Sequence, residues 1–226
     1  MPWNSGVLFP RYCALCGVQL QAGEPDWEGC LGCAGAWPDL RAPLGRIWVE
    51  ERVFGLAGCA GFRLRGHPAL RRRIYGMKYG GERGWARAAG VWLAQGVREP
   101  PGSEAARQAG LGGVVLVPIP LHWRRRWRRG FNQAEELARG CARVWGVPVA
   151  PQLLRRDVHR TSLTGLGRQG RQQALRHVFR GVPAAAVPGI VLVDDVLTTG
   201  ATIRACSHAL EQAGHRVVGL VALALA

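Results

Sequence analysis

The sequence predicts an α/β fold: a mostly parallel sheet with helices on both faces, preceded by a small cysteine-rich module. Three short apolar runs have the length of buried strands: 114–117, 190–193 and 220–225. Stretches with helical character come before or between these runs: 85–97, 131–145 and 201–213. Strands that alternate with helices favour a parallel sheet covered on both faces. A chain of 226 residues can form one such domain with a small appendage.

Shorter elements are predicted from glycine and proline punctuation. Residues 47–64 are expected to form two short strands interrupted at 55–61, and a basic helix is expected from Pro68 to a stop at Gly76. Residues 147–149 are expected to form a short strand. Loops or flexible connections are expected at three places: 78–81, 99–113 and 154–176. The last is long and basic, and such a loop inside a compact domain is usually functional or mobile.

The N-terminal segment contains two CxxC pairs separated by 13 residues: Cys13, Cys16, Cys30 and Cys33. Four thiolates in two tight turns suit the tetrahedral coordination of a structural Zn²⁺. The alternative is a coincidental cluster of buried thiols, although this segment has few aliphatic residues to bury them. We therefore expect a zinc-binding module at 1–42 and the α/β domain at 43–226. The other three cysteines are expected in the core: Cys59, Cys141 and Cys206.

The charge balance is strongly basic, with 30 Lys plus Arg against 15 Asp plus Glu and a net charge of +15. Such a charge favours polyanionic partners, either nucleic acid or polyphosphate ligands. The alternative is a coding bias that places arginine on a solvated surface. Neither a signal peptide nor a run long enough to span a bilayer is visible. The sequence therefore predicts a cytoplasmic protein with no membrane span and reduced cysteines.

The segment HWRRRWRRG at 122–130 interleaves two tryptophans with five arginines. Arginine combined with aromatic rings is how proteins neutralise and stack single-stranded nucleic acid. The alternative is an exposed basic helix end whose tryptophans, Trp123 and Trp127, are tucked into the core. Lys78, the only lysine, precedes Gly80 and Gly81, so it could either reach a phosphate or be a solvated loop residue.

Two acids, Asp194 and Asp195, follow the apolar run at 190–193, at the edge of the sheet where open α/β folds bind ligands. Vicinal carboxylates can accept hydrogen bonds from a ribose diol and can hold hydrated Mg²⁺. A turn follows whose amide groups and hydroxyls suit a 5-phosphate: Thr198, Thr199, Gly200, Ala201 and Thr202. The alternative, a plain helix cap, needs only one acid.

The stretch VLVDDVLTTGAT resembles the phosphoribosyl pyrophosphate (PRPP) motif of type I phosphoribosyltransferases. Together with the four cysteines, the VPIP strand end and RRGFNQAEELA, it makes the chain similar to the ComF family of competence proteins from about residue 10 onward. The resemblance implies a type I phosphoribosyltransferase-like domain behind a zinc finger. It also implies that Asp194 and Asp195 bind the ribose, that 198–202 bind the 5-phosphate, and that 155–176 closes over the site.

The basic segments would then supply the pyrophosphate or polyanion contacts. The candidates are Lys78, Arg128, Arg129, Arg160, Arg168 and Arg171. The expected function is binding of PRPP or a nucleotide phosphate in natural competence, with handling of incoming single-stranded DNA. The alternative is an active Mg-dependent, amidophosphoribosyltransferase-like enzyme of the glycosyltransferase class, with an unidentified acceptor. A third hypothesis makes the zinc module a docking surface for a helicase or another DNA-uptake protein.

Overall fold

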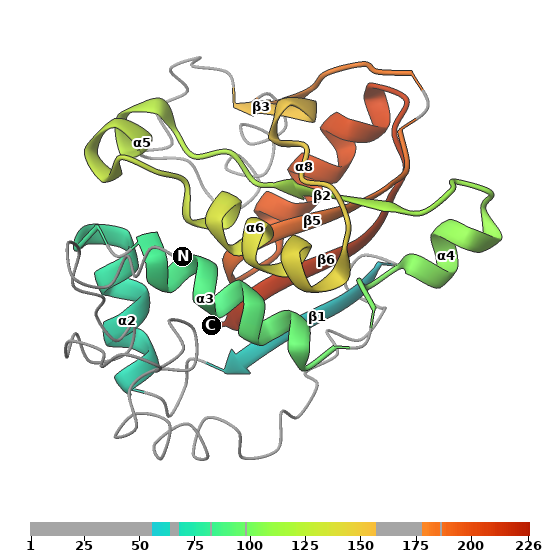
Figure 1. Ribbon diagram of the computed structural model, residues 1–226. Helices are drawn as coiled ribbons and strands as arrows, with labels where there is room; N and C mark the ends of the chain where they lie inside the picture. Colours follow the sequence, from blue (N-terminus) through green and yellow to red (C-terminus); the bar gives the residue numbers. More distant parts are fainter. Residues whose placement is uncertain (1–55, 64–67, 82, 98, 157–177, 186) are drawn as a thin grey trace, which may run out of the picture.

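The computed structural model describes residues 56–63, 68–81, 83–97, 99–156, 178–185 and 187–226 (Figure 1). Several predictions lie outside these residues: the zinc module with its four cysteines, the boundary near 42, and the part of the basic loop that holds Arg160, Arg168 and Arg171. None of the helices in the described residues combines the length and apolar character that crossing a bilayer requires.

A four-stranded parallel sheet forms the centre of the molecule (Figure 1). Its strands, in spatial order, are β1 Ala57–Arg63, β6 Val217–Leu225, β5 Gly189–Leu197 and β2 Val114–Pro118. All three neighbouring pairs are parallel. The predicted α/β class and parallel sheet are therefore confirmed.

Helices cover both faces of the sheet. On one face lie α3, Arg83–Gln95, and α6, Gln133–Trp145; on the other lies α8, Ala201–Gln212. Alternate residues of each inner strand join one of two apolar clusters, as Val191 and Leu192 do. Burial on both faces explains why these strands are nearly continuous apolar runs. The three cysteines outside the N-terminal pairs are buried, as expected: Cys59, Cys141 and Cys206.

Helices α3 and α6 cross at two glycines, Gly90 and Gly140. A Cβ atom added to Gly90 would lie 2.1 Å from the carbonyl oxygen of Leu137, and one added to Gly140 would lie 2.1 Å from that of Arg87. These backbones therefore touch directly, and only glycine permits that separation. The crossing fixes the position of α6 against the sheet.

Smaller elements complete the described fold. They are α2 Pro68–Tyr79, α4 Ser103–Gln108, α5 Trp123–Arg129 and the 3₁₀ turn η2 Pro151–Leu153. Strands β3 Leu154–Arg156 and β4 Phe179–Gly181 pair antiparallel in a separate two-stranded sheet beside α8. The start of the predicted basic loop is therefore a strand, and the predicted strand at 147–149 is only a single bridge between Leu116 and Val149.

The predicted interruption at 55–61 is wrong, because β1 runs through it. Gly58 and Gly61 do not make a turn there. A Cβ atom at Gly58 would lie 3.2 Å from Cγ of Leu220, and one at Gly61 would lie 3.1 Å from the carbonyl oxygen of Leu223. These glycines allow close packing of β1 against its neighbours, which is the other common reason for glycine in a strand.

Two further predictions need correction. Helix α2 does not stop at Gly76; it continues to Tyr79, and the turn at Gly81, with φ of 72°, ends it. Lys78 is therefore a helical residue, not a loop residue. The predicted flexible connection at 99–113 contains α4, which starts where Ser103 Oγ donates a hydrogen bond to the carbonyl oxygen of Pro100 at 2.7 Å.

Candidate functional site

The carboxyl ends of β1, β2 and β5 lie along the same edge of the parallel sheet. The chain leaves this edge into α2, α5 and the turn before α8, respectively. Pairing between β2 and β5 ends at Pro118 and Val193, whereas β5 continues beside β6 to Leu197. Asp194 therefore begins the part of β5 that extends past its β2 neighbour. This edge is where open parallel sheets bind ligands.

Asp194 and Asp195 lie within β5, where the sequence placed them just after a strand. The backbone N–H of Asp195 donates to Oδ1 of Asp194 at 2.8 Å. Burial, and after it the Asp195 carboxylate, raises the pKa of Asp194 well above its ordinary value. Asp194 also lies close enough to Cys206 of α8 to help raise the pKa of that buried thiol, after burial itself. A ligand that donates hydrogen bonds to Asp194, or that brings a cation next to it, would stabilise the ionised form of this buried carboxyl.

Lys78 reaches the second acid from the last turn of α2. Its Nζ lies 2.9 Å from Oδ2 of Asp195, and the two side chains are 26% and 15% exposed. The structure therefore brings together Lys78 and Asp195, two residues that the sequence proposed for one site from segments 117 positions apart. The arrangement provides a cation and two carboxyls at one edge of the sheet.

The turn from Thr198 to Gly200 connects the acids to α8. Thr198 and Thr199 are exposed, and Gly200 is buried with φ of 69°. No side chain caps α8 at Gly200, and the Thr199 hydroxyl accepts only a long hydrogen bond, 3.5 Å, from the N–H of Ala201. Thr202 is half-buried in the first turn. The amide groups of a helix start without a side-chain cap suit an anion, and the adjacent carboxyls suit hydroxyls.

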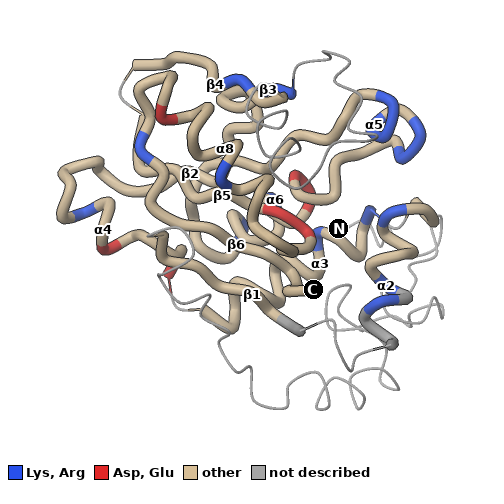
Figure 2. Tube along the Cα trace, turned by 180° about the vertical axis from the view of Figure 1, so that it is seen from behind, with Lys and Arg blue, Asp and Glu red and all other residues tan. Residues whose placement is uncertain are grey.

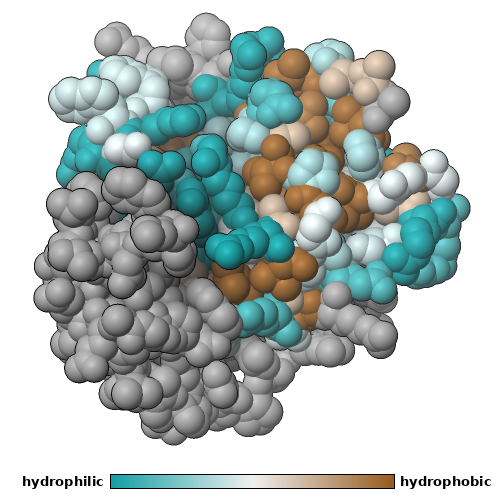
Figure 3. Space-filling model, viewed as in Figure 1, coloured by the Kyte–Doolittle hydropathy of each residue, from teal (hydrophilic) through white to brown (hydrophobic). Residues whose placement is uncertain are grey.

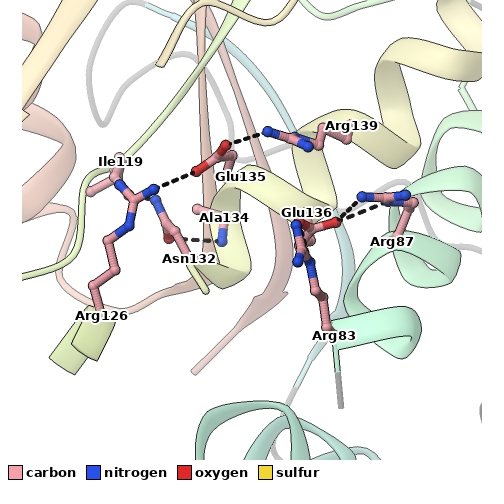
Figure 4. Close-up of polar contacts among 9 residues, drawn as sticks. All are labelled: Arg83, Arg87, Ile119, Arg126, Asn132, Ala134, Glu135, Glu136 and Arg139. Atoms are coloured by element: carbon pink, nitrogen blue, oxygen red, sulfur yellow. Dashed lines mark hydrogen bonds and ion pairs between the residues drawn. The ribbon is translucent and has the colours of Figure 1, made fainter. Parts of the chain in front are cut away.

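Helix α5 carries the predicted basic segment. Two consecutive glutamates at the start of α6 link that helix to α5 through Glu135 and to α3 through Glu136 (Figure 4). Glu135 accepts from Arg139 at 2.7 Å and lies 3.9 Å from Arg126 of α5. Glu136 is buried and binds Arg83 and Arg87 of α3. Burial acts to raise the pKa of Glu136, but hydrogen bonds from the two arginines outweigh it and the pKa is lowered.

Arg128 and Arg129, two of the predicted polyanion contacts, lie in this helix, and in the described part of the chain neither forms an ion pair with Asp194 or Asp195, whose cationic partner is Lys78. Cζ of Arg129 lies 5.3 Å from the ring centroid of Tyr79 of α2. The exposed fractions of Trp123 and Trp127 are 51% and 84%, so the alternative that tucks these tryptophans into the core is wrong. In the space-filling view, hydrophilic residues gather over α5 and the adjoining start of α6 (Figure 3).

The sequence missed two groups of residues near this edge. Tyr75 and Tyr79 are exposed on α2, and the prediction of a loop at 78–81 hid their helical spacing. Arg156, at the end of β3, is partly buried, and its Nε has no hydrogen-bond partner among the residues that the structure describes. Burial, then Arg125, lowers the pKa of Arg156; burial, then Arg156, lowers that of His122. The sequence indicated basic segments at 122–130 and 154–176, but it did not show that His122, Arg125 and Arg156 would lie close together.

Comparison with known proteins gives partial matches. No family model matches the chain. Competence protein F of Haemophilus influenzae is 34% identical over 115 residues, 50% of each sequence. DNA utilization protein YhgH of Salmonella typhi is 33% identical over 103 residues, 46% of this chain and 45% of that protein, and the protein of that name from Escherichia coli K12 is 31% identical over 103 residues. The chain spans about half the length of the curated relatives it matches, and both names support the resemblance to the ComF family.

Proposed function

We propose that this chain binds PRPP or a nucleotide phosphate at the turn between β5 and α8, as a ComF-like protein of natural competence that handles incoming single-stranded DNA on the cytoplasmic side. The observation that carries the ligand is the adjacency of Asp194, Asp195 and the start of α8, which has no side-chain cap. Carboxylates accept from a ribose diol, and free amide groups donate to a phosphate. The pairing of Lys78 with Asp195 supports the same site, because it adds a cation next to the acids.

The DNA role rests on the relatives and on charge. Of the three relatives compared above, one is named for competence and two are named for DNA utilization. The chain carries a net charge of +15, and basic residues of α2 and α5 lie on one side of the molecule (Figure 2). Contacts with phosphates release counterions, so affinity for DNA should fall steeply with salt. A helicase or another uptake protein is a further partner of this proposed role.

Two metals belong to the proposal. Mg²⁺ would enter with PRPP, and the carboxylates of Asp194 and Asp195 are the oxygen ligands it prefers. A structural Zn²⁺ would be held by the four N-terminal cysteines, a donor set that fits this metal: Cys13, Cys16, Cys30 and Cys33. Metal analysis of the purified chain should find about one zinc per chain, and a clearly lower content would contradict the four-thiolate site.

A pyrophosphate-release assay separates binding from turnover. The full chain is incubated with PRPP, Mg²⁺ and a panel of purine, pyrimidine and amine acceptors, with and without single-stranded DNA, while PRPP binding is measured in parallel. The proposed binding role predicts that PRPP is bound and pyrophosphate is not released with any acceptor. Release with one acceptor would instead establish the transferase alternative, in which Mg²⁺ and the basic side chains stabilise the leaving pyrophosphate.

A further inference from the structure

The described surface carries four large exposed aromatic side chains, and all four are on two helices. Tyr75 and Tyr79 of α2 are 66% and 59% exposed, and Trp123 and Trp127 of α5 are 51% and 84% exposed. Aromatic side chains contribute a large area when they pack, so a group of four exposed rings is typical of a surface that a partner covers. We call these four residues, together with the arginines of α5, the aromatic–arginine face.

The two helices form one surface. Cζ of Arg129 lies 5.3 Å from the ring centroid of Tyr79, which joins α5 to α2 through a cation–π contact. Within α2, the rings of Tyr75 and Tyr79 are 4.5 Å apart. Trp123 and Trp127 have the same four-residue spacing on α5, which places them on one side of that helix. The face therefore offers two pairs of rings, linked by a guanidinium.

The charge of this face selects a polyanion. Five of the seven residues of α5 are arginines, and neither α5 nor α2 contains an acid. Among the described residues, the acid that forms an ion pair with α5 is Glu135, which lies 3.9 Å from Arg126 and is also bound to Arg139. Cζ of Arg124 lies 5.3 Å from the ring centroid of Trp123, so a cation accompanies a ring there too. Figure 2 shows these basic residues of α2 and α5 on the same side of the chain trace.

Rings next to arginines distinguish a single strand from other polyanions. Bases in a duplex are stacked on each other and present only their edges, whereas an unpaired base has a free π-face. A polyphosphate or a duplex would use the arginines but not the four rings. An apolar protein partner would use the rings but would gain little from the arginines beside them.

We propose that the aromatic–arginine face binds single-stranded DNA, with bases stacked on Tyr75, Tyr79, Trp123 and Trp127 and with phosphates paired to α5 arginines. The choice of DNA as the ligand is based on the proposed role in DNA handling, whereas the inference that bases stack on this face is based on the exposed rings. The face also borders the proposed ligand site, because Tyr79 follows Lys78, which binds Asp195. A strand on this face would therefore pass close to the PRPP site.

The test measures binding of the full chain to a fluorescent oligothymidylate of about 12 nucleotides, a length within the range one single-strand module covers. Trp127→Ala is expected to weaken binding by about tenfold, the loss of one stacked base. Trp127→Phe, which keeps a ring, should restore most of the affinity, whereas Trp127→Leu, which keeps only apolar bulk, should behave like alanine. Wild-type affinity in the leucine variant would overturn stacking.

Two matched controls lie on α6, which runs away from α5 (Figure 1). Val144→Ala removes another exposed apolar side chain, 39% exposed, and should leave affinity unchanged. Arg124→Ala should reduce the salt slope of log affinity by about 0.7, the value for one phosphate contact on a single strand, whereas Arg143→Ala should not. If the α5 and α6 variants lose affinity for oligothymidylate equally, the binding is nonspecific attraction to a basic protein, and the proposal for the aromatic–arginine face is wrong.

Three further measurements separate this inference from the proposed ligand. PRPP binding of Trp127→Ala should equal that of the wild type. If the wild type binds PRPP but not oligothymidylate, the proposal for the aromatic–arginine face is wrong and the proposed PRPP site stands. If the wild type binds oligothymidylate through the rings but does not bind PRPP, the proposed PRPP site is wrong and the aromatic–arginine face stands. Duplex DNA bound as tightly as the single strand would overturn stacking, and tighter binding of oligouridylate would overturn the choice of DNA.

Discussion

Replacing Asp194 and Asp195 together by asparagine will remove PRPP binding, with affinity reduced on the order of 100-fold or more. Each carboxylate is proposed to accept a hydrogen bond from a ribose hydroxyl, and hydrogen bonds to charged groups contribute about 1.5–3 kcal/mol each. The double substitution also removes the negative charge that would attract Mg²⁺. The measurement is isothermal titration of PRPP in the presence of Mg²⁺, on both proteins under the same conditions.

The matched control for this change is Glu104→Gln. Glu104 is an exposed acid of α4, where it pairs with Arg107 at 2.7 Å. Helix α4 precedes β2 and so lies at the amino end of that strand, away from the site (Figure 1). This variant also loses one negative charge and should bind PRPP as the wild type does. Undiminished PRPP affinity in the Asp194 and Asp195 double variant, with its fold intact by circular dichroism, would refute the diol site.

Substituting alanine for Gly90 will destabilise the fold severely, by about 3 kcal/mol or more. The new Cβ atom would lie 2.1 Å from the carbonyl oxygen of Leu137, closer than any real contact, and that oxygen belongs to backbone. The two helices must therefore separate, which opens the core between them and the sheet. Urea denaturation followed by circular dichroism measures the change in the free energy of unfolding.

The same substitution at Gly84 of α3 provides the control. A Cβ atom there meets no atom of the described residues within 4 Å, and Gly84 is exposed. Alanine should stabilise the chain at this position by about 0.5 kcal/mol, because it lowers the entropy cost of the helix. If Gly90→Ala and Gly84→Ala behave alike, the helices do not cross at the separation seen between α3 and α6.

The main strands could be predicted because they are buried on both faces. The apolar run at 114–117 forms nearly all of β2, and the run at 190–193 lies in the first half of β5. The end of β5 could not be predicted from hydrophobicity, because Asp194 and Asp195 end the apolar run while pairing with β6 continues to Leu197 and Leu225. Backbone hydrogen bonding to β6, which does not depend on side-chain hydrophobicity, determines this boundary.

Glycine was the least reliable signal in this chain. Gly58 and Gly61 lie inside β1, where they let the strand approach the leucines of β6. Gly76 lies inside α2, whose end is set by the positive φ of Gly81. A sequence shows that a glycine is present but does not show whether it makes a turn or allows close packing. That distinction depends on the neighbouring element, which is distant in the chain.

The candidate site could be predicted in part. Asp194 to Thr202 are contiguous, so their types and spacing were visible in the sequence. The position of Lys78 beside Asp195 depends on α2 passing the end of β5, which no local pattern reveals. Tyr75 and Tyr79 became significant only when α2 proved to extend past Gly76. The residue types within one segment could be predicted from the sequence, whereas contacts between segments distant in the chain could be seen only in the folded structure.

The central claim, that the turn after β5 holds a ribose with a 5-phosphate, is tested most directly by titrating PRPP and close analogues into the wild-type chain with Mg²⁺. Saturable binding of PRPP is expected, with weaker binding of ribose 5-phosphate, which lacks the pyrophosphate, and of free pyrophosphate, which lacks the ribose. Binding of pyrophosphate as tight as that of PRPP, or no binding of PRPP, would contradict the account.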